Sequence, residues 1–286
     1  MAMISATRGR SHRGSIVRHA LLMLAAFAML YPLLWMLGSS FKPENLIFSD
    51  PSPIPKVWDL KNYADGWHAL RVSFSTFYAN SFLIAALAVI GNLSACSLTA
   101  FAFARLEFRF KWFWFALMMG TLMLPYHVTL VPQYILFLNL GWVNTFLPLV
   151  VPKFLAVDSF FIFLMVQFFR GIPREIDEAA IMDGCGPWRI YWRIMLPLSL
   201  PVLATAAIFS FIWTYDDFLG PLIYLNDMRQ YTVPLALRAF IDSSGGESLY
   251  GEMFAMSALS LLPVFVVFLA FQKLIIRGVT VGALKR

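Results

Sequence analysis

The chain has 286 residues, a formal net charge of +6 and a mean hydropathy of +0.72. Hydrophobic residues make up 60% of it and charged residues only 13%, whereas a soluble domain contains about 45–50% apolar and about 25% charged residues. So few charges cannot cover a large apolar core in water. The composition therefore excludes an ordinary soluble protein and indicates a membrane protein.

Six apolar stretches are long enough to cross a bilayer as helices, which takes about 20 residues. In chain order they are residues 16–38, 74–104, 112–138, 142–168, 199–225 and 254–276. The first follows a basic segment, as in a signal peptide, but it is long and lacks a small-x-small cleavage site, so we expect a retained span. Backbone groups in lipid need internal partners, and the expected fold is therefore an all-α membrane protein with six transmembrane helices.

Lys and Arg are unevenly distributed between the connecting segments, and cytoplasmic loops are enriched in these residues. Segments 8–18, 105–111, 170–193 and 273–286 hold fifteen of the 22, and the segments on the other side, 42–71 and 229–238, hold six. Both termini are therefore expected in the cytoplasm. The positive charge is a topology signal, and no nucleic-acid partner is expected.

This topology divides the chain into three parts. Residues 1–73 comprise the N-terminal cytoplasmic segment, the first span and the first extracytoplasmic loop. Residues 74–276 form a core of five spans, with a cytoplasmic loop at 169–198, and residues 277–286 are a cytoplasmic tail. The outer segments 39–73 and 226–253 are either surfaces for a partner or connecting loops.

Motifs of catalysis, phosphate binding and metal binding are missing from the sequence. It contains no G-x-x-x-x-G-K-[ST], H-E-x-x-H or G-x-S-x-G motif and no Cys/His metal spacing. Its four histidines are scattered, and Cys96 and Cys185 give no disulfide framework. The chain is therefore expected to be a non-catalytic protein that holds no cofactor or metal of its own.

A polar segment separates the fourth and fifth apolar stretches, EIDEAAIMDGCGPWRIYWRIMLPLSLP at residues 175–201. Three acids near its start place negative charge at the positive end of a helix dipole, and Gly184 can adopt the left-handed conformation that ends a helix. Residues 173–183 are expected to form a helix about 16 Å long. A second short helix is expected from Pro187, with an apolar stripe of Trp188, Ile190, Tyr191 and Ile194.

Helices this short are marginal in water on their own. The segment therefore either docks onto another protein or lies on lipid headgroups, the latter favoured by Arg189, Trp192 and Arg193. The pattern of residues leaves both interpretations open.

The same segment resembles the E-A-A-x3-G-x9-I-x-L-P signature of ATP-binding-cassette importer permeases, and every specified position agrees. The resemblance extends to Ser40-Phe41-Lys42-Pro43, Lys61-Asn62-Tyr63, FAFAR at 101–105, Leu124-Pro125, YDDFLGPLIYL at 215–225 and FQKLIIRGVTVGALKR at 271–286. Together these segments are similar to the carbohydrate-importer branch, in particular the shorter six-span partner of the maltose-transporter type.

The resemblance implies a methionine-importer-like permease bundle whose cytoplasmic coupling helix sits on an ATPase subunit. The coupling residues would be Glu178, Ala179, Ala180, Asp183, Gly184, Ile194, Leu196 and Pro197. ATP-driven closure of the ATPases would move this helix and, through Pro197 and Pro201, the fifth span.

The resemblance also implies partners and a location. The partners would be a second permease subunit in a heterodimer, two ATPase subunits that bind ATP and Mg, an extracytoplasmic solute-binding protein and membrane lipid. The location would be a bacterial plasma (inner) membrane, which the chain crosses several times.

Four charged residues, Lys153, Asp158, Asp216 and Asp217, lie away from the ends of the expected spans, where charges are costly and usually face a cavity or a partner. Lys153 and Asp158 are five residues apart, about 140° around a helix, so they are predicted not to pair with each other. Asp216-Asp217 stand where the family often has Asn-Asp, so Asp217 carries over and Asp216 adds a charge. Asp217 is expected either to line or brace the solute pathway or to make a helix-packing hydrogen bond.

The intramembrane acids leave an alternative function open, an ion-coupled secondary transporter that uses Asp158, Asp216 or Asp217. This alternative does not explain the signature at 178–197.

Two further patterns concern architecture. Pro125, Pro132, Pro148 and Pro152 interrupt the third and fourth stretches, either around a substrate cavity or as packing kinks. Gly91, Ala95 and Thr99 recur every four residues and predict a small-residue face for close helix contact.

Overall fold

The computed structural model describes residues 12–242 and 249–283, with side chains described for 17–241 and 249–272. All regular secondary structure in these ranges is helical. The basic residues at 8–10, most of the C-terminal motif and the SSGGE loop lie outside the described residues or side chains. The longest helices are α1 (His12–Ser39), α4 (Phe74–Arg105), α12 (Leu200–Tyr215) and α15 (Tyr250–Ala283).

Shorter helices connect these four. They are α2 (Glu44–Ile47), α3 (Lys61–His68), α5 (Lys111–Thr121), α6 (Tyr126–Asn139), α7 (Leu147–Val150), η1 (Val151–Leu155), α8 (Ser159–Arg170), α9 (Glu175–Met182), α10 (Pro187–Ile190), η2 (Tyr191–Met195), α11 (Leu196–Leu198), α13 (Leu219–Tyr224), η3 (Met228–Gln230) and α14 (Val233–Asp242). Among them, η1 and η3 are 3₁₀-helices and η2 is a turn of π-helix.

Four stretches of the described chain are long and apolar enough to cross a membrane as helices. They are Val17–Ser39, Phe74–Arg105, Leu147–Gly171 and Tyr250–Gln272. Two bent pairs pass the same test, α5 with α6 at 100° and Pro187–Leu198 with α12 at 77°, which allows up to six spans. The first bend lies at Leu124-Pro125, because Pro125 directly precedes α6 and cannot continue the helix before it.

Helix α4 lies at the centre of the bundle and packs against α8, α12, α14 and η1. Its buried face carries small residues, and Ala85, Ala88 and Ala100 are fully buried. A Cβ atom on Gly91 would lie 2.9 Å from the backbone carbon of Lys153 and from the ring of Phe154. The predicted close contact on this face is therefore confirmed at Gly91.

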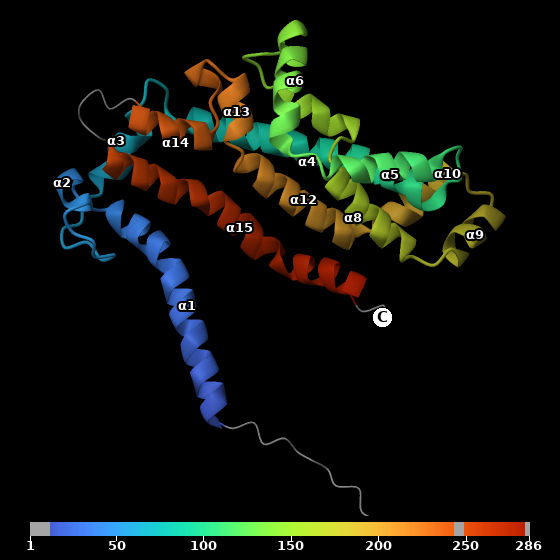
Figure 1. Cartoon of the computed structure of the whole chain (residues 1–286), viewed down its shortest axis with the longest axis horizontal. Helices are drawn as coiled ribbons and strands as arrows, with labels where there is room; N and C mark the ends of the chain where they lie inside the picture. The colour runs from blue at the N-terminus through green and yellow to red at the C-terminus, as the bar shows by residue number, and fades with distance from the viewer. Residues whose placement is uncertain (1–11, 243–248, 284–286) are drawn as a thin grey trace, which may run out of the picture.

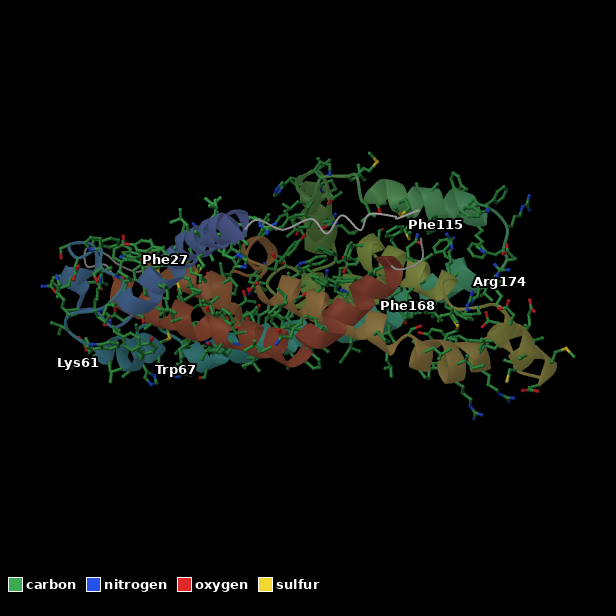
Figure 2. All side chains as sticks on the ribbon, turned by 90° about the horizontal axis from the view of Figure 1, so that it is seen from below. Phe27, Lys61, Trp67, Phe115, Phe168 and Arg174 are labelled. Carbon is green, nitrogen blue, oxygen red and sulfur yellow. The ribbon has the colours of Figure 1, made fainter. Side chains whose placement is uncertain are left out.

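The two predicted outer segments meet at one end of the molecule. Figure 1 shows α2, α3 and α14 at this end and α9 and α10 at the opposite end. The Glu44 carboxylate of the first segment accepts hydrogen bonds from the backbone N–H groups of Tyr250 (3.0 Å) and Gly251 (2.8 Å) at the start of α15. Figure 2 shows the same separation, with Lys61 and Trp67 at one end and Arg174 at the other.

Helices α1 and α6 leave the body of the bundle (Figure 1). None of the residues in the most apolar part of α1 is buried against the rest of the chain. Contact with the bundle is confined to its C-terminal part, where the rings of Trp35 and Phe254 lie 5.4 Å apart in an edge-on arrangement. The exposed apolar side of α1 requires lipid or another protein around it.

The prediction that Lys153 and Asp158 do not pair is wrong. Lys153 Nζ donates a hydrogen bond to Asp158 Oδ2 at 2.9 Å. The expected continuous helix is broken here, because η1 ends at Leu155 and the next residue, Ala156, has a left-handed φ of 55°. The regular spacing of 100° per residue therefore does not apply across this segment.

The fifth apolar stretch is also interrupted. Helix α12 ends at Tyr215 and α13 begins at Leu219, so Asp216 and Asp217 lie in the break and not inside a continuous span. Asp216 is exposed, and its backbone N–H caps α12 by donating to the Ile212 carbonyl at 3.0 Å. The break removes these carboxylates from a lipid-facing helix, where a charge would be costly.

Candidate functional site: the α9 loop and the adjacent cavity

The signature segment forms an exposed loop, residues 169–198, that we call the α9 loop. Its first helix, α9, spans Glu175–Met182, close to the predicted 173–183. Gly184 has a φ of +76°, and two hydrogen bonds close the helix, from the Gly184 N–H to Ile181 O and from the Cys185 N–H to Ala180 O, both 2.9 Å. This is a Schellman cap with Gly184 at its left-handed position. The predicted helix stop is confirmed.

The two faces of α9 differ sharply. Ala180 is buried against the core cluster that contains Phe103 and Phe169. Glu178 and Met182 lie on the opposite side and are exposed, Met182 to 87%. Ile176, Ala179, Ile181 and Asp183 are exposed as well. Ala180 thus packs α9 onto its own chain, while Glu178, Ala179 and Met182 are exposed.

The second half of the α9 loop docks on α4. Of the predicted stripe, Ile190 and Tyr191 are buried, Ile194 is half-buried and Trp188 is exposed. The Tyr191 hydroxyl lies 2.7 Å from Ser97 Oγ of α4, within hydrogen-bond distance. Leu196 is half-buried and Pro197 exposed, next to the 77° bend before α12. Contacts within the chain therefore hold this half in place.

An ion pair fixes the start of α9. Arg105, the last residue of α4, places Nε 2.7 Å from Asp177 Oδ2 and donates from Nη2 to the Ile172 carbonyl at 2.8 Å. The side chains of Arg105 and Asp177 are only 7% and 14% exposed. Sequence reasoning missed this pair, because the two residues lie far apart in the chain and only the fold brings them together.

A cavity of about 750 Å³ opens between α5, α6, η1, α8 and α12. Aromatic side chains line one side, with the rings of Phe160 and Phe161 lying 5.1 and 5.4 Å from that of Trp213. Other lining residues carry hydroxyl, amide or charged groups: Thr121, Tyr126, Thr129, Gln133, Lys153, Asp158, Ser159, Asp217 and Tyr224. The remaining ones are apolar: Leu122, Leu124, Pro148, Leu149, Pro152 and Val157. Rings beside hydrogen-bonding groups can contact both faces of a polyhydroxylated solute.

Asp217 both lines this cavity and braces its wall. Its Oδ1 accepts a hydrogen bond from the Gly220 N–H at 3.2 Å in the first turn of α13. A Cβ on Gly220 would lie 2.5 Å from Asp217 Oδ2, so only glycine leaves room for this carboxylate. The Lys153–Asp158 ion pair lines the same cavity. The structure thus brings three of the four predicted intramembrane charges together, and Asp216 is not a lining residue.

Within the described ranges, no group of three His, Cys, Asp or Glu residues could hold a metal ion. His127 is exposed near the start of α6.

Comparisons with known proteins agree with this architecture. The family model of the binding-protein-dependent transport system inner membrane component matches residues 96–281. The chain is 30% identical to the diacetylchitobiose uptake system permease protein NgcG of Streptomyces coelicolor, over 98% of this chain and 92% of that protein. It is 32% identical to the trehalose/maltose transport system permease protein MalG of Thermococcus litoralis, over 96% and 99% of the two chains.

The fold is also similar to a solved structure. A chain of a bacterial ABC transporter involved in the import of the acidic polysaccharide alginate superposes with a TM-score of 0.82, at 23% identity, over 96% of this chain and 99% of that one.

This chain is an ABC-type importer permease, and it belongs to the family of binding-protein-dependent transport system inner membrane components. It is a multi-pass inner-membrane protein and a non-catalytic subunit, since ATP hydrolysis lies in separate subunits. Permeases of this family work in general with a partner permease, ATPase subunits and a solute-binding protein. Family membership sets aside the ion-coupled alternative.

Proposed function

We propose that this chain is one half of a heterodimeric permease that moves a sugar or sugar-like solute into the bacterial cytoplasm. The observation that carries the proposal is the α9 loop. Every position of the signature carries the residue that the signature specifies. Helix α9 ends at a cap formed by Gly184 and lies at one end of the bundle. The names of NgcG and MalG, which are sugar permeases, support a carbohydrate or similar solute.

The proposed coupling helix is α9. Its outer face offers apolar contact through Ile181 and Met182 and negative charge through Glu178 and Asp183, a surface suited to a groove on a cytoplasmic ATPase. Ala179 allows close approach, and Gly184 sets the turn. Two ATPase subunits, one for each permease half, carry ATP and Mg, and this chain holds no cofactor.

The proposed solute pathway is the cavity that contains Asp217 and the Lys153–Asp158 pair. Six spans arise if each bent pair counts as one. Both termini and α9 then lie on the same side of the membrane, and the distribution of Lys and Arg supports the cytoplasmic side. The outer end with α2, α3 and α14 then faces the solute-binding protein. The exposed apolar side of α1 suits a second permease subunit or lipid. The proposed division at residues 1–73, 74–276 and 277–286 follows the same topology.

Co-purification tests the coupling proposal. Complexes of the wild-type chain with the ATPase of its transporter are expected to survive affinity purification, and Glu178→Arg or Met182→Asp is expected to release the ATPase. Lys56→Glu, at the opposite end and 77% exposed, serves as a matched surface control. Retention of the ATPase by both α9 variants would contradict the proposal.

Transport by reconstituted complexes tests the pathway. Asp217→Asn preserves the shape of the side chain and is expected to lower solute uptake about tenfold or more while complex yield stays near that of the wild type, because a buried charged acceptor is lost at the cavity wall. Equal loss of uptake and assembly would assign Asp217 to packing alone. Asp216→Asn, which is exposed in this chain, is the control and is expected to leave uptake nearly unchanged.

A further inference from the structure

We infer that Arg105 is a positioning residue that links the coupling helix to α4, so that α4 transmits the movement of α9 to the solute cavity. This inference rests on the proposed coupling function of α9. The sequence predicts that movement of α9 reaches the fifth span, α12, through Pro197 and Pro201. The inferred route through α4, at the centre of the bundle, is a second one.

The connection from α9 to α4 is short and nearly closed to solvent. One guanidinium group contacts both Asp177, in the first turn of α9, and the Ile172 carbonyl in the linker before it, at 2.7 and 2.8 Å. The contact with Ile172 is a hydrogen bond and the contact with Asp177 is an ion pair. The fork of a planar guanidinium reaches both groups at once, which a lysine ammonium cannot reproduce. Displacement of α9 therefore pulls on the end of α4 through two contacts.

The loop also contacts α4 at a second point. The Tyr191 hydroxyl lies 2.7 Å from Ser97 Oγ, two turns before Arg105 on the same helix. Ala180 and Tyr191 belong to the same buried cluster as Ala100 and Phe101 of α4. The α9 loop is thus attached to α4 by polar contacts on both sides of its turn and by packing between them.

Helix α4 then reaches the cavity wall. Gly91 lies about 21 Å from Arg105 along the helix, at 1.5 Å per residue. At Gly91 the helix backbone is packed directly against Lys153 and Phe154, and Lys153 belongs to the ion pair that lines the cavity. Because a packed helix moves as a rigid element, displacement at Arg105 shifts η1 and the charge of Lys153 that it carries.

The energetic character of the pair decides the design of the test. Removing one partner of a buried ion pair leaves an uncompensated charge and is strongly destabilising, whereas replacing both partners with neutral groups of similar shape is often tolerated. Neither Asp177 Oδ1 nor Arg105 Nε makes a hydrogen bond among the described residues, so the contact of Nε with Asp177 Oδ2 is an ion pair, and the charge of Asp177 is compensated there by Arg105. The informative variant is therefore the double replacement Arg105→Gln with Asp177→Asn.

The experiment compares full complexes of permease, ATPase and solute-binding protein in liposomes. Measurements are ATPase yield in the complex, basal ATP hydrolysis, and its stimulation by loaded binding protein. The double variant is expected to assemble with wild-type yield but to lose stimulation by at least about fivefold, the lower range of coupling between sites. Glu107→Gln, which removes the exposed partner of the Lys111 ion pair in the neighbouring loop, is the matched control and is expected to retain stimulation.

Either of two results would overturn the inference. Wild-type stimulation in the double variant would show that the ion pair transmits nothing, and failure of the double variant to assemble would show that the pair only maintains the fold. Failure of the proposed function itself is distinguishable, because the wild-type chain would then neither retain the ATPase nor show stimulation.

Discussion

Buried polar side chains near the outer end explain motifs whose role the sequence leaves open. Lys42 of the Ser40–Pro43 motif is 1% exposed, and its Nζ donates to the carbonyls of Asp50 (2.6 Å) and Ser52 (2.7 Å). Asn62 of the second motif donates to the Ser40 and Lys42 carbonyls at 3.0 and 2.9 Å. These residues tie the end of α1 to α3, so both motifs are structural in this chain.

Lys42→Met is expected to destabilise the protein, because two buried carbonyls lose a charged donor, and hydrogen bonds to charged groups contribute about 1.5–3 kcal/mol each at most. The measurement is the thermal midpoint of the purified protein in detergent. Lys56→Met is the control, since Lys56 is 77% exposed and its ion pair with Asp50 at 3.3 Å lies at the surface. Equal midpoints for the two variants would contradict the structural role of Lys42.

Two glycines flank the turn after α9 and respond differently to a side chain. At Gly184 an added Cβ meets nothing within 4 Å, so its φ of +76° alone makes Gly184→Ala costly, by about 1–2 kcal/mol. At Gly186 the space is equally open but φ is −78°. Hydrogen exchange of the α9 amides is expected to rise in Gly184→Ala and to stay unchanged in Gly186→Ala; equal exchange in both would show that the cap does not stabilise α9.

At the scale of elements, interrupted helices surround the cavity, and the unbroken helix α4 lies beside them. Breaks at Pro125, Ala156 and Asp216-Asp217 place polar groups around the cavity, and the backbone freed at the last break is recovered by the Asp217–Gly220 hydrogen bond. Helix α4 runs unbroken beside them and contacts α12 through the hydrogen bond from Asn92 Nδ2 to Ser210 Oγ at 2.9 Å. The unbroken helix α4 therefore supports the interrupted segments that pack against it.

Gly91→Ala tests the support that α4 gives to η1. The new methyl group would overlap the Lys153 backbone and the Phe154 ring, and overpacking of this kind costs about 1–3 kcal/mol. Gly120→Ala in α5 is the matched control, since nothing lies within 4 Å of its Cβ position. Thermal unfolding in detergent is expected to show a lower midpoint for Gly91→Ala than for Gly120→Ala. A reversed order would place η1 away from α4.

At the scale of the whole molecule, the two ends differ in construction. One end gathers α2, α3 and α14 with the start of α15, and the other holds α9 and α10 beside the last turns of α4 (Figure 1). Basic residues stand near the second end, where Arg170 lies over the rings of Trp112 and Phe115 at 5.5 and 5.1 Å. This arrangement agrees with a cytoplasmic α9 end.

Thiol labelling measures the orientation directly. In a chain with Cys96 and Cys185 replaced by Ala, Met182→Cys is expected to react with a membrane-impermeant maleimide only in inside-out vesicles. Leu60→Cys, 68% exposed at the opposite end, is expected to react only in intact right-side-out preparations. The same labelling pattern for both positions would overturn the proposed topology.

Local physical properties explain what could be predicted. The membrane class, the limits of Phe74–Arg105 to within one residue, the helix at 175–182 and its stop at Gly184 all follow from nearby residues, through apolar length, dipole complementarity and the freedom of glycine. The signature at 178–197 is likewise local, and it indicated the family that the comparisons show.

Other features depend on a local break in a helix or on contacts between distant segments. The prediction that Lys153 and Asp158 do not pair took residues 153–158 to be regular helix. The left-handed Ala156 between them instead brings the two side chains together. The packing of α4, α8 and α12 determines three further features. It brings Arg105 to Asp177, it buries Ala180, and it decides which residues line the cavity. Sequence alone determined which segments are apolar, helical and capped, because those properties are encoded by near neighbours. Tertiary structure decided which charges meet, because only packing sets distances between residues remote in the chain.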